Sequence, residues 1–376
     1  MLELVNTRLH EMGAAGTAHG YWILFIIPAF FAFFGEKRIT KNNAPYTLKF
    51  DGLWWLFFTI VTIFLGFRVQ VGGDWGSYKR YYELINSAPL SESFSIMDDP
   101  SYLILNWLSG YFGLGILAVN FISAAIFTLG LFIFCRSLPR PFLALTAAIP
   151  YMVIVVAAGY TRQAIALGLI MIGLVAISRE RNLLFYALVI LAATFHKTAL
   201  IMLAISGLVT SKNKFLSLSI VVIIFYLAYS TFLSEGYKDL IQYYYQESYG
   251  SSGAFIRILM LTLPSVLFLF FVERFKFSST LKSLWLWSSI ASLALLALLF
   301  IIDASTAIDR IGLYLLPIQL IVFAYLPDIF SKRGDNNKII ILLIILYYLL
   351  VLYVWLYFST HSYLWRPYRN ALFEMI

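Results

Sequence analysis

Twelve hydrophobic segments dominate the sequence, and they constrain the fold more than any short motif does. A helix needs roughly 20 predominantly apolar residues to cross the hydrocarbon core of a bilayer, and each segment approaches that length. They lie near residues 20–35, 52–67, 115–135, 141–158, 163–178, 182–195, 198–210, 215–233, 254–272, 283–302, 311–327 and 339–358. The sequence therefore predicts an all-α, polytopic integral membrane protein with about twelve transmembrane helices, arranged as a single transmembrane domain over residues 1–376.

Composition supports this class. Hydrophobic residues make up 61% of the chain and charged residues only 12%, whereas about a quarter of the residues in soluble domains are charged. The single cysteine, Cys135, excludes a disulfide framework and a cysteine metal site. The first twenty residues contain no basic stretch leading into an apolar run, so we expect no cleaved signal peptide.

The apolar run 183–209 admits two interpretations, one tilted helix or a hairpin of two short helices that turns at His196-Lys197. With the hairpin, six loops fall on one side of the membrane and carry sixteen of the 27 lysines and arginines. The positive-inside rule makes this side cytoplasmic, with both termini outside. These loops are 36–50, 136–140, 178–182, 210–214, 273–282 and 328–338.

The hairpin has a geometric consequence. Helices of about 13 residues rise only about 20 Å, less than the roughly 30 Å hydrocarbon core. The turn at His196-Lys197, and Arg162 with it, is then expected to lie below the outer surface. Irregular backbone at that depth must be buried in protein or line an aqueous cavity. We therefore expect short or re-entrant helices around an outward-facing cavity with basic groups at its floor.

Three expected outer segments are long enough to carry function, namely 68–114, 234–253 and the C-terminal tail 359–376. In the first, apolar side chains recur at helical spacing, which predicts an amphipathic helix on the membrane surface. These side chains are Trp75, Tyr78, Tyr82 and Ile85. Residues 238–249 have the same character. Aromatic side chains at this level anchor a protein at the interface or stack on sugar rings.

Four arginines, Arg68, Arg162, Arg257 and Arg310, sit at or inside apolar segments on the side that the positive-inside rule disfavours. A charge at membrane depth is costly, so it marks a polar partner or an anionic ligand. Each one alone could reach the interface or pair locally, as Arg310 could with Asp309. Together they favour an anionic substrate, because guanidinium groups bind phosphate oxygens in bidentate fashion.

Two kinds of side chain could handle a proton. Asp74 follows two glycines and either caps the next helix or faces the cavity to orient or deprotonate a hydroxyl. Asp99 precedes Pro100, which predicts a helix start with Asp99 as its cap. His196 is either a hydrogen-bonded hinge or, beside Lys197, a proton acceptor or a hydrogen-bond donor to a phosphate oxygen. A lone histidine makes a poor metal site, and the arginines already supply counter-charge, so we expect no metal. An ion bound at Asp74 or Asp99 is the alternative that remains open.

Motifs of nucleotide-dependent or soluble hydrolytic enzymes are absent from the sequence. It has no Walker loop, dinucleotide fingerprint, Gly-x-Ser-x-Gly elbow or His-Glu-x-x-His helix, so we expect no cofactor. The net charge of +8 is explained by the loop cations, and nucleic acid is not an expected partner.

Several short elements occur along the chain, namely Phe67-Arg68, Gly73-Asp74-Trp75 with Tyr78, Asp99-Pro100 with Tyr102 and Asn106, Thr161-Arg162-Gln163-Ala164, Phe195-His196-Lys197-Thr198, Asp309-Arg310 with Tyr314, and Trp365-Arg366-Pro367-Tyr368. In this order they resemble the EpsG/Wzy-type family of bacterial polysaccharide polymerases. The chain departs from the family pattern at Asp99, where Glu is more usual, and at Trp75, where Tyr is more usual. Neither departure touches the arginines.

The resemblance implies an O-antigen or exopolysaccharide polymerase, a glycosyltransferase that spans the bacterial inner membrane many times. Such an enzyme moves a growing glycan from undecaprenyl diphosphate to an incoming undecaprenyl-diphosphate-linked repeat unit on the periplasmic face. The implied partners are these lipid-linked oligosaccharides, membrane lipids and a chain-length regulator protein.

The site hypothesis combines the resemblance with the buried charges. The expected catalytic residues are His196, Asp74, Arg162 and Arg310. The expected substrate-binding residues are Arg68, Arg162, Arg257, Arg310, Lys197, Tyr78, Asp99, Trp365 and Tyr368. Two alternatives remain open, a single-addition lipid-linked glycosyltransferase or O-antigen ligase, and a flippase for an anionic lipid-linked sugar. The flippase needs access from both faces, whereas the expected arginine cluster lies on one.

Overall fold

The computed structural model describes residues 18–38, 45–210, 253–301, 305–331 and 337–374. Regular structure in these ranges is helical, apart from an isolated bridge between Arg68 and Asn370. Five of the described helices are long and apolar enough to cross a membrane, and a bent pair forms a sixth. The chain is therefore a helical membrane protein.

The helices of the first part of the chain follow the expected segments closely. They are α2 (His19–Phe34), α3 (Gly52–Gly66), α7 (Gly115–Arg136), α8 (Pro141–Ala148) with its π-helical continuation η3 (Ile149–Ala157), α9 (Thr161–Ser178), α10 (Asn182–Phe195), the 3₁₀ turn η4 (Lys197–Leu200) and α11 (Ile201–Thr210). The separation of the expected segments 141–158 and 163–178 is confirmed, because η3 ends at Ala157 and α9 begins at Thr161.

The second part agrees equally well. It contains α13 (Ala254–Phe271) with η5 (Val272–Phe275), α14 (Ser279–Leu298), α15 (Ser305–Gly312), η6 (Leu313–Leu315), α16 (Pro317–Ile329) and α17 (Lys338–Phe358). A bend of 45° separates the α15 part from α16, where we expected one span at 311–327. The expected segment 215–233 lies outside the described residues, and the count of twelve spans stays a prediction.

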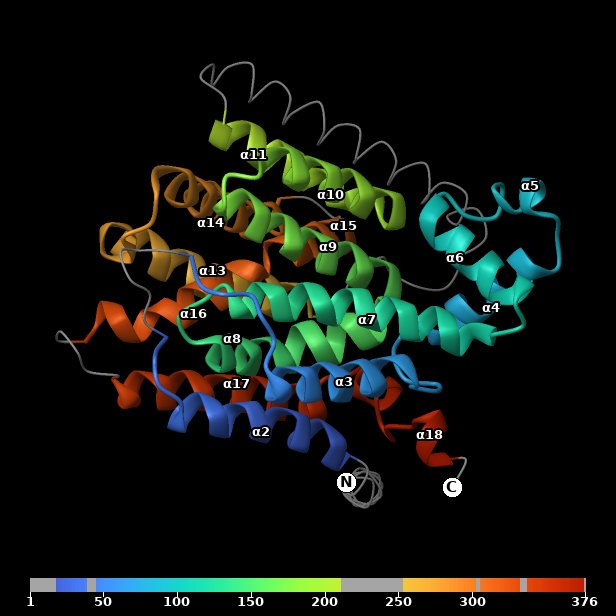
Figure 1. The fold of residues 1–376 in the computed structure, drawn as a ribbon, viewed down its shortest axis with the longest axis horizontal. Coiled ribbons are helices and arrows are strands. Elements are labelled where there is room, and N and C mark those ends of the chain that lie inside the picture. Colours follow the sequence, from blue (N-terminus) through green and yellow to red (C-terminus); the bar gives the residue numbers. More distant parts are fainter. Residues whose placement is uncertain (1–17, 39–44, 211–252, 302–304, 332–336, 375–376) are drawn as a thin grey trace.

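The long helices lie side by side, and the two ends of the bundle differ (Figure 1). One end carries α4 (Trp75–Asn86), α5 (Leu90–Ser93), α6 (Pro100–Tyr111) and the tail with η7 (Ser362–Leu364) and α18 (Ala371–Glu374). We call it the α4 end. The opposite end, which we call the Arg179 end, carries the short connection between α9 and α10.

Helix α9 is the centre of the core, and 83% of its 18 residues are buried. It packs against α7 and α10. Glycines allow the approach to α7, since a Cβ at Gly130 would lie 2.0 Å from the carbonyl oxygen of Gly168. Small residues at a contact between apolar helices let the backbones come close, as expected in lipid.

The connection from α9 to α10 brings His196, at the end of α10, close to Arg162, at the beginning of α9. It spans only residues 179–181, with Glu180 in the left-handed region at φ 61°. Helix α10 therefore runs back along α9, and its end lies near the beginning of α9. Helix α10 ends at Phe195, and His196 is extended at φ −159° and ψ 115°. The break at His196 is thus confirmed, and a single continuous helix over 183–209 is excluded.

The expected outer segments are helical where they are described. Helix α4 buries Tyr78 and Ile85 of the predicted apolar stripe and packs on α6. The stripe therefore contacts protein, whereas we expected it to face lipid. The predicted helix at 238–249 lies outside the described residues.

Candidate functional site

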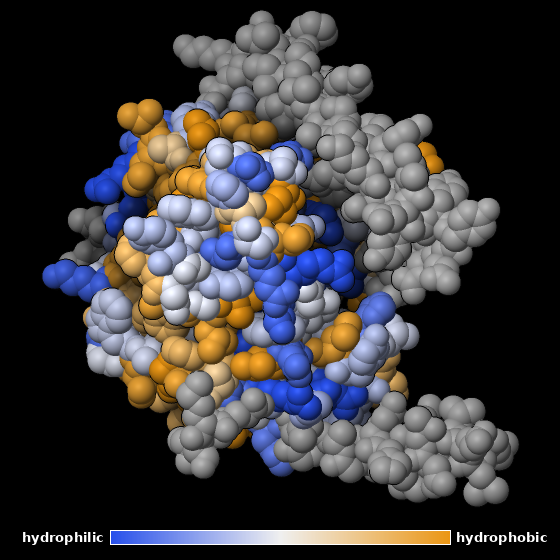
Figure 2. Space-filling model, turned by 90° about the vertical axis from the view of Figure 1, so that its right-hand side faces the viewer, coloured by the Kyte–Doolittle hydropathy of each residue, from blue (hydrophilic) through white to orange (hydrophobic). Residues whose placement is uncertain are grey.

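Arginines from three distant helices converge at the α4 end. Arg162 lies in the first turn of α9, Arg257 in α13 and Arg310 in α15. His196 interacts electrostatically with Arg162 and Arg310, and Asp74 interacts with the same two arginines. Hydrophilic side chains gather on this face of the molecule (Figure 2).

Tyr160 joins Arg257 to this group. Its hydroxyl interacts electrostatically with Arg257, Asp309, Asp74 and Arg310. The sequence prediction that Arg162, Arg257 and Arg310 share one neighbourhood therefore agrees with their placement.

Arg162 is held by an acid and by two aromatic rings. Its Nη1 donates to Oδ2 of Asp99 at 2.5 Å, and its guanidinium lies 5.9 Å from the ring centre of Tyr78 and 5.8 Å from that of Tyr81. Asp99 precedes α6 but makes no capping hydrogen bond there. The predicted capping role of Asp99 is therefore wrong, since its carboxylate is aimed at Arg162.

Arg257 is paired in the same way. Its Nε donates to Oδ1 of Asp309 at 2.7 Å, and the two side chains are only 10% and 8% exposed. The sequence analysis named Asp309 only as a local partner of Arg310 and as part of a family element. Its hydrogen bond to Arg257 makes it a site residue that sequence reasoning missed. The signal was an acid inside an apolar segment, which requires a cationic partner somewhere in the fold.

His196 sits in a small hydrogen-bonded group at the turn after α10. Its Nδ1 lies 2.7 Å from Oγ1 of Thr198, and that hydroxyl donates to the Tyr314 hydroxyl at 3.5 Å. Lys197 points elsewhere and forms an ion pair with Asp98 at 3.1 Å. Thr198 and Tyr314 were noted only as parts of the family elements, yet they set the orientation of the imidazole.

Asp74 occupies the N-cap position of α4 without capping it, because its side chain makes no hydrogen bond to the helix amides. Burial raises the pKa of the Asp74 carboxyl, and the nearby Arg310 and Arg162 oppose this shift. The structure therefore does not support the capping role, and the role of Asp74 toward a substrate hydroxyl stays a prediction.

Arg68 lies behind the cluster, 2% exposed. Its Nε donates to the Ala158 carbonyl at 2.9 Å and its Nη2 to the Thr161 hydroxyl at 2.7 Å. These bonds hold the segment that leads into Arg162. Arg68 therefore supports the site from inside the protein and does not face a ligand.

The C-terminal tail supports the same segment. Trp365 is 2% exposed, and its Nε1 donates to the Ile154 carbonyl at 2.7 Å. A Cβ at Gly159 would lie 2.7 Å from the Trp365 ring. The Tyr368 hydroxyl donates to the Phe64 carbonyl at 2.7 Å. We expected Trp365 and Tyr368 to contact glycan, but both are used to pack the tail against the helices.

Comparison with known proteins supplies the family. The model of the EpsG family matches residues 52–370, a range that includes each of the site residues above. The chain belongs to the EpsG family. No curated protein and no solved structure matches it.

Membership of the EpsG family indicates a polysaccharide polymerase with glycosyltransferase-like activity in a membrane. The site has the groups that such chemistry needs. Three guanidinium groups supply positive charge for an anionic substrate, and an imidazole and a carboxylate lie beside them as candidate proton acceptors.

Proposed function

We propose that this EpsG-family protein transfers a growing glycan from undecaprenyl diphosphate to an incoming undecaprenyl-diphosphate-linked repeat unit, at the outer face of the bacterial inner membrane. The observation that carries the proposal is the convergence of Arg162, Arg257 and Arg310 on His196 and Asp74. A diphosphate leaving group needs several cations, and a sugar hydroxyl needs a proton acceptor.

The arginines bind the donor diphosphate and stabilise the charge that grows on it. Arg162 and Arg257 are already oriented by Asp99 and Asp309, so little reorganisation is needed as the reaction proceeds. Arg310 completes the set from α15. The partly exposed ring of Tyr81 beside Arg162 offers apolar surface for the first sugar.

The transfer step follows from this geometry. A hydroxyl oxygen of the acceptor sugar attacks the anomeric carbon of the donor glycan, and the bond from that carbon to the diphosphate oxygen breaks. The bonding electrons leave with the diphosphate, which the arginines bind. The hydroxyl proton passes to His196 or Asp74.

Thr198 indicates which imidazole nitrogen is available. In this proposal the Thr198 hydroxyl donates to Tyr314, and its oxygen accepts a hydrogen bond from Nδ1–H of His196. Nε2 is then the nitrogen that accepts a proton.

The membrane arrangement belongs to the same proposal. We place the α4 end at the outer face, with about twelve spans around an outward-facing cavity. The Arg179 end then faces the cytoplasm, as the loop cations require. Lipid chains of both substrates enter between the helices from the bilayer.

The test uses purified protein in nanodiscs with defined undecaprenyl-linked repeat units and no nucleotide. A ladder of products supports a polymerase, and it should disappear in Arg162→Ala and Arg310→Ala. A single-step product would instead identify a single-addition transferase or a ligase. Movement of the glycolipid across the bilayer without chain growth would identify a flippase. Arg80→Ala, an exposed arginine on α4, is the matched control.

A further inference from the structure

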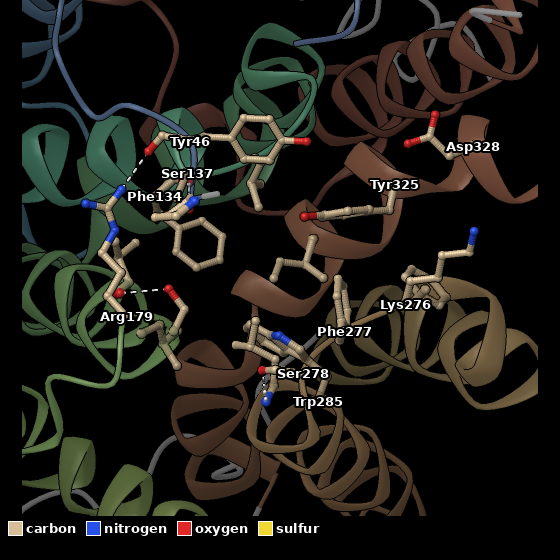
Figure 3. Close-up of a pocket in the computed structure, with 18 of the residues that line it drawn as sticks. Tyr46, Phe134, Ser137, Arg179, Lys276, Phe277, Ser278, Trp285, Tyr325 and Asp328 are labelled. Atoms are coloured by element: carbon tan, nitrogen blue, oxygen red, sulfur yellow. Dashed lines mark hydrogen bonds between the residues drawn. The ribbon is translucent and has the colours of Figure 1, made fainter. Parts of the chain in front are cut away.

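A large cavity opens at the Arg179 end, far from the arginine cluster. Its volume is about 1210 Å³, which is larger than the 300–1,000 Å³ typical of small-molecule sites. It lies between α7 and α9 on one side and α14 and α16 on the other, with η5 at its rim (Figure 3). None of the chemistry proposed above uses it.

The rim of the cavity is basic. Five cationic side chains line it, Lys37, Arg179, Arg181, Arg274 and Lys276, against the two acids Glu180 and Asp328. Asp328 is already neutralised, because Lys37 and Arg140 each approach its carboxylate to 2.8 Å. In the described part of the chain, Arg274 and Lys276 form no ion pair. An anion entering this cavity therefore meets positive charge from three separate segments.

The interior supplies one unsatisfied donor. Trp285 lines the cavity and is 2% exposed, yet its Nε1 has no hydrogen-bond partner among the described residues. A buried N–H without an acceptor costs free energy. The hydroxyl ends of Tyr46 and Tyr325 face the same space (Figure 3). These three groups are suited to oxygen atoms of a bound head group.

The remaining wall is apolar. Leu174, Val175, Leu281 and Ile321 line it on the helix faces. A small hydrophilic anion gains nothing from such a wall, whereas a lipid chain does. Basic pockets between transmembrane helices on the cytoplasmic side are a recognised way to bind anionic lipid head groups.

We propose that this cavity binds an anionic phospholipid, with its phosphate at Arg274, Lys276 and Trp285 and its chains along the apolar wall. The site is separate from the proposed transferase site and does not depend on its chemistry.

The experiment uses the full chain in phosphatidylcholine nanodiscs that contain a photoactivatable phosphatidylglycerol. Cross-links should map to residues 174–181 and 274–285, and unlabelled phosphatidylglycerol should compete for them. Arg274→Gln/Lys276→Gln should reduce the labelling roughly tenfold, which corresponds to about 1.4 kcal/mol of binding. Trp285→Phe, which keeps the ring and removes the N–H, should reduce it about threefold.

The control separates this site from general attraction to anionic lipid. Lys282→Gln/Lys338→Gln removes two charges from the same end outside the cavity and should leave the labelling unchanged. Arg274 and Lys276 are exposed, so their variant should elute from size-exclusion chromatography like the wild type. Equal losses in both double variants would overturn the proposal. Full competition by soluble glycerol 3-phosphate would also overturn it, because the site would then recognise free phosphate.

Discussion

The two ends of the bundle use arginine in opposite ways. At the α4 end, Arg162 and Arg257 are largely buried and pair with Asp99 and Asp309 from distant segments. At the Arg179 end, arginines mostly bind backbone carbonyls, and Arg179, for example, donates to Tyr46 at 2.6 Å. Others are Arg38 to Arg136 and Thr47, and Arg136 to Lys49. Arg140 is an exception at this end, because it is buried and pairs with Asp328 as well as donating to Ala324.

This difference separates the arginines that orient the protein in the membrane from the arginines of the proposed site. Cations bound to loop carbonyls near the surface need no carboxylate, and they follow the charge bias that orients membrane proteins. A buried guanidinium group needs polar partners when no substrate is present, because an unpaired charge at that depth is too costly. Arg68 uses backbone carbonyls and a hydroxyl, whereas Arg162 and Arg257 each use an acid. The acids therefore mark which arginines are available to exchange a carboxylate for a phosphate.

The largest expected effect comes from removing one of these acids. Asp309→Asn leaves Arg257 buried without its carboxylate, and breaking a buried pair costs about 3–5 kcal/mol. Thermal unfolding in detergent should show a large decrease in Tm, while Glu273→Gln at the other end should not. If Asp309→Asn unfolded like the wild type, the contrast between the ends would be lost.

Removing the site arginines should be the next largest effect, this time on rate. Arg162→Ala and Arg310→Ala should each slow glycan chain growth about 10²–10³-fold, the usual loss when a group that stabilises transition-state charge is removed. Product ladders from defined lipid-linked repeats measure this rate. The exposed Lys282→Ala should polymerise normally, and a comparable loss there would contradict the assignment.

Asp74 gives a prediction in pH. Because burial raises the pKa of its carboxyl, the carboxylate form is lost as pH falls through a value above the ordinary 3.9 or so. With Asp74 as the proton acceptor, the rate of chain growth should fall as the pH drops through this raised pKa.

Asp74→Asn should slow the reaction and remove the decline in rate at acidic pH, which is the acid limb of the pH profile. The raised pKa also means that the ionised carboxylate is disfavoured in the folded protein, so Asp74→Asn should not lower Tm. An unchanged acid limb in Asp74→Asn would assign the proton to His196.

The smallest effect is expected for an exposed pair at the Arg179 end. Lys282 lies 2.5 Å from Glu273, with side chains 38% and 81% exposed. Surface pairs of this kind contribute about 0–1 kcal/mol. Lys282→Gln should leave the free energy of unfolding within this margin, as measured by denaturant titration.

Hydropathy predicted the helices because it is a local property. Eleven of the twelve expected segments correspond to described helices, including the break at His196. The partner of each charge is a long-range property, and it could not be read from spacing. Arg162 finds Asp99 across 63 residues and Arg257 finds Asp309 across 52.

The main error in the predicted site concerned residues with structural roles, of which Arg68 and Trp365 are buried and Tyr368 is partly buried. Arg68, Trp365 and Tyr368 stand in the family elements, and their polar or aromatic character suggested contact with substrate. Each instead donates a hydrogen bond to a helix carbonyl. A polar group that satisfies the backbone and one that binds a ligand are identical in sequence, and burial distinguishes them.

The docking of Trp365 has a consequence for biogenesis. The ring sits against Gly159 and bonds Ile154, just before the first turn of α9, although more than 200 residues separate it from both in the chain. The helices are therefore synthesised long before the Trp365 side chain that packs against them. Until Trp365 is synthesised, the segment before α9 lacks the ring that packs against Gly159 and the donor that binds Ile154.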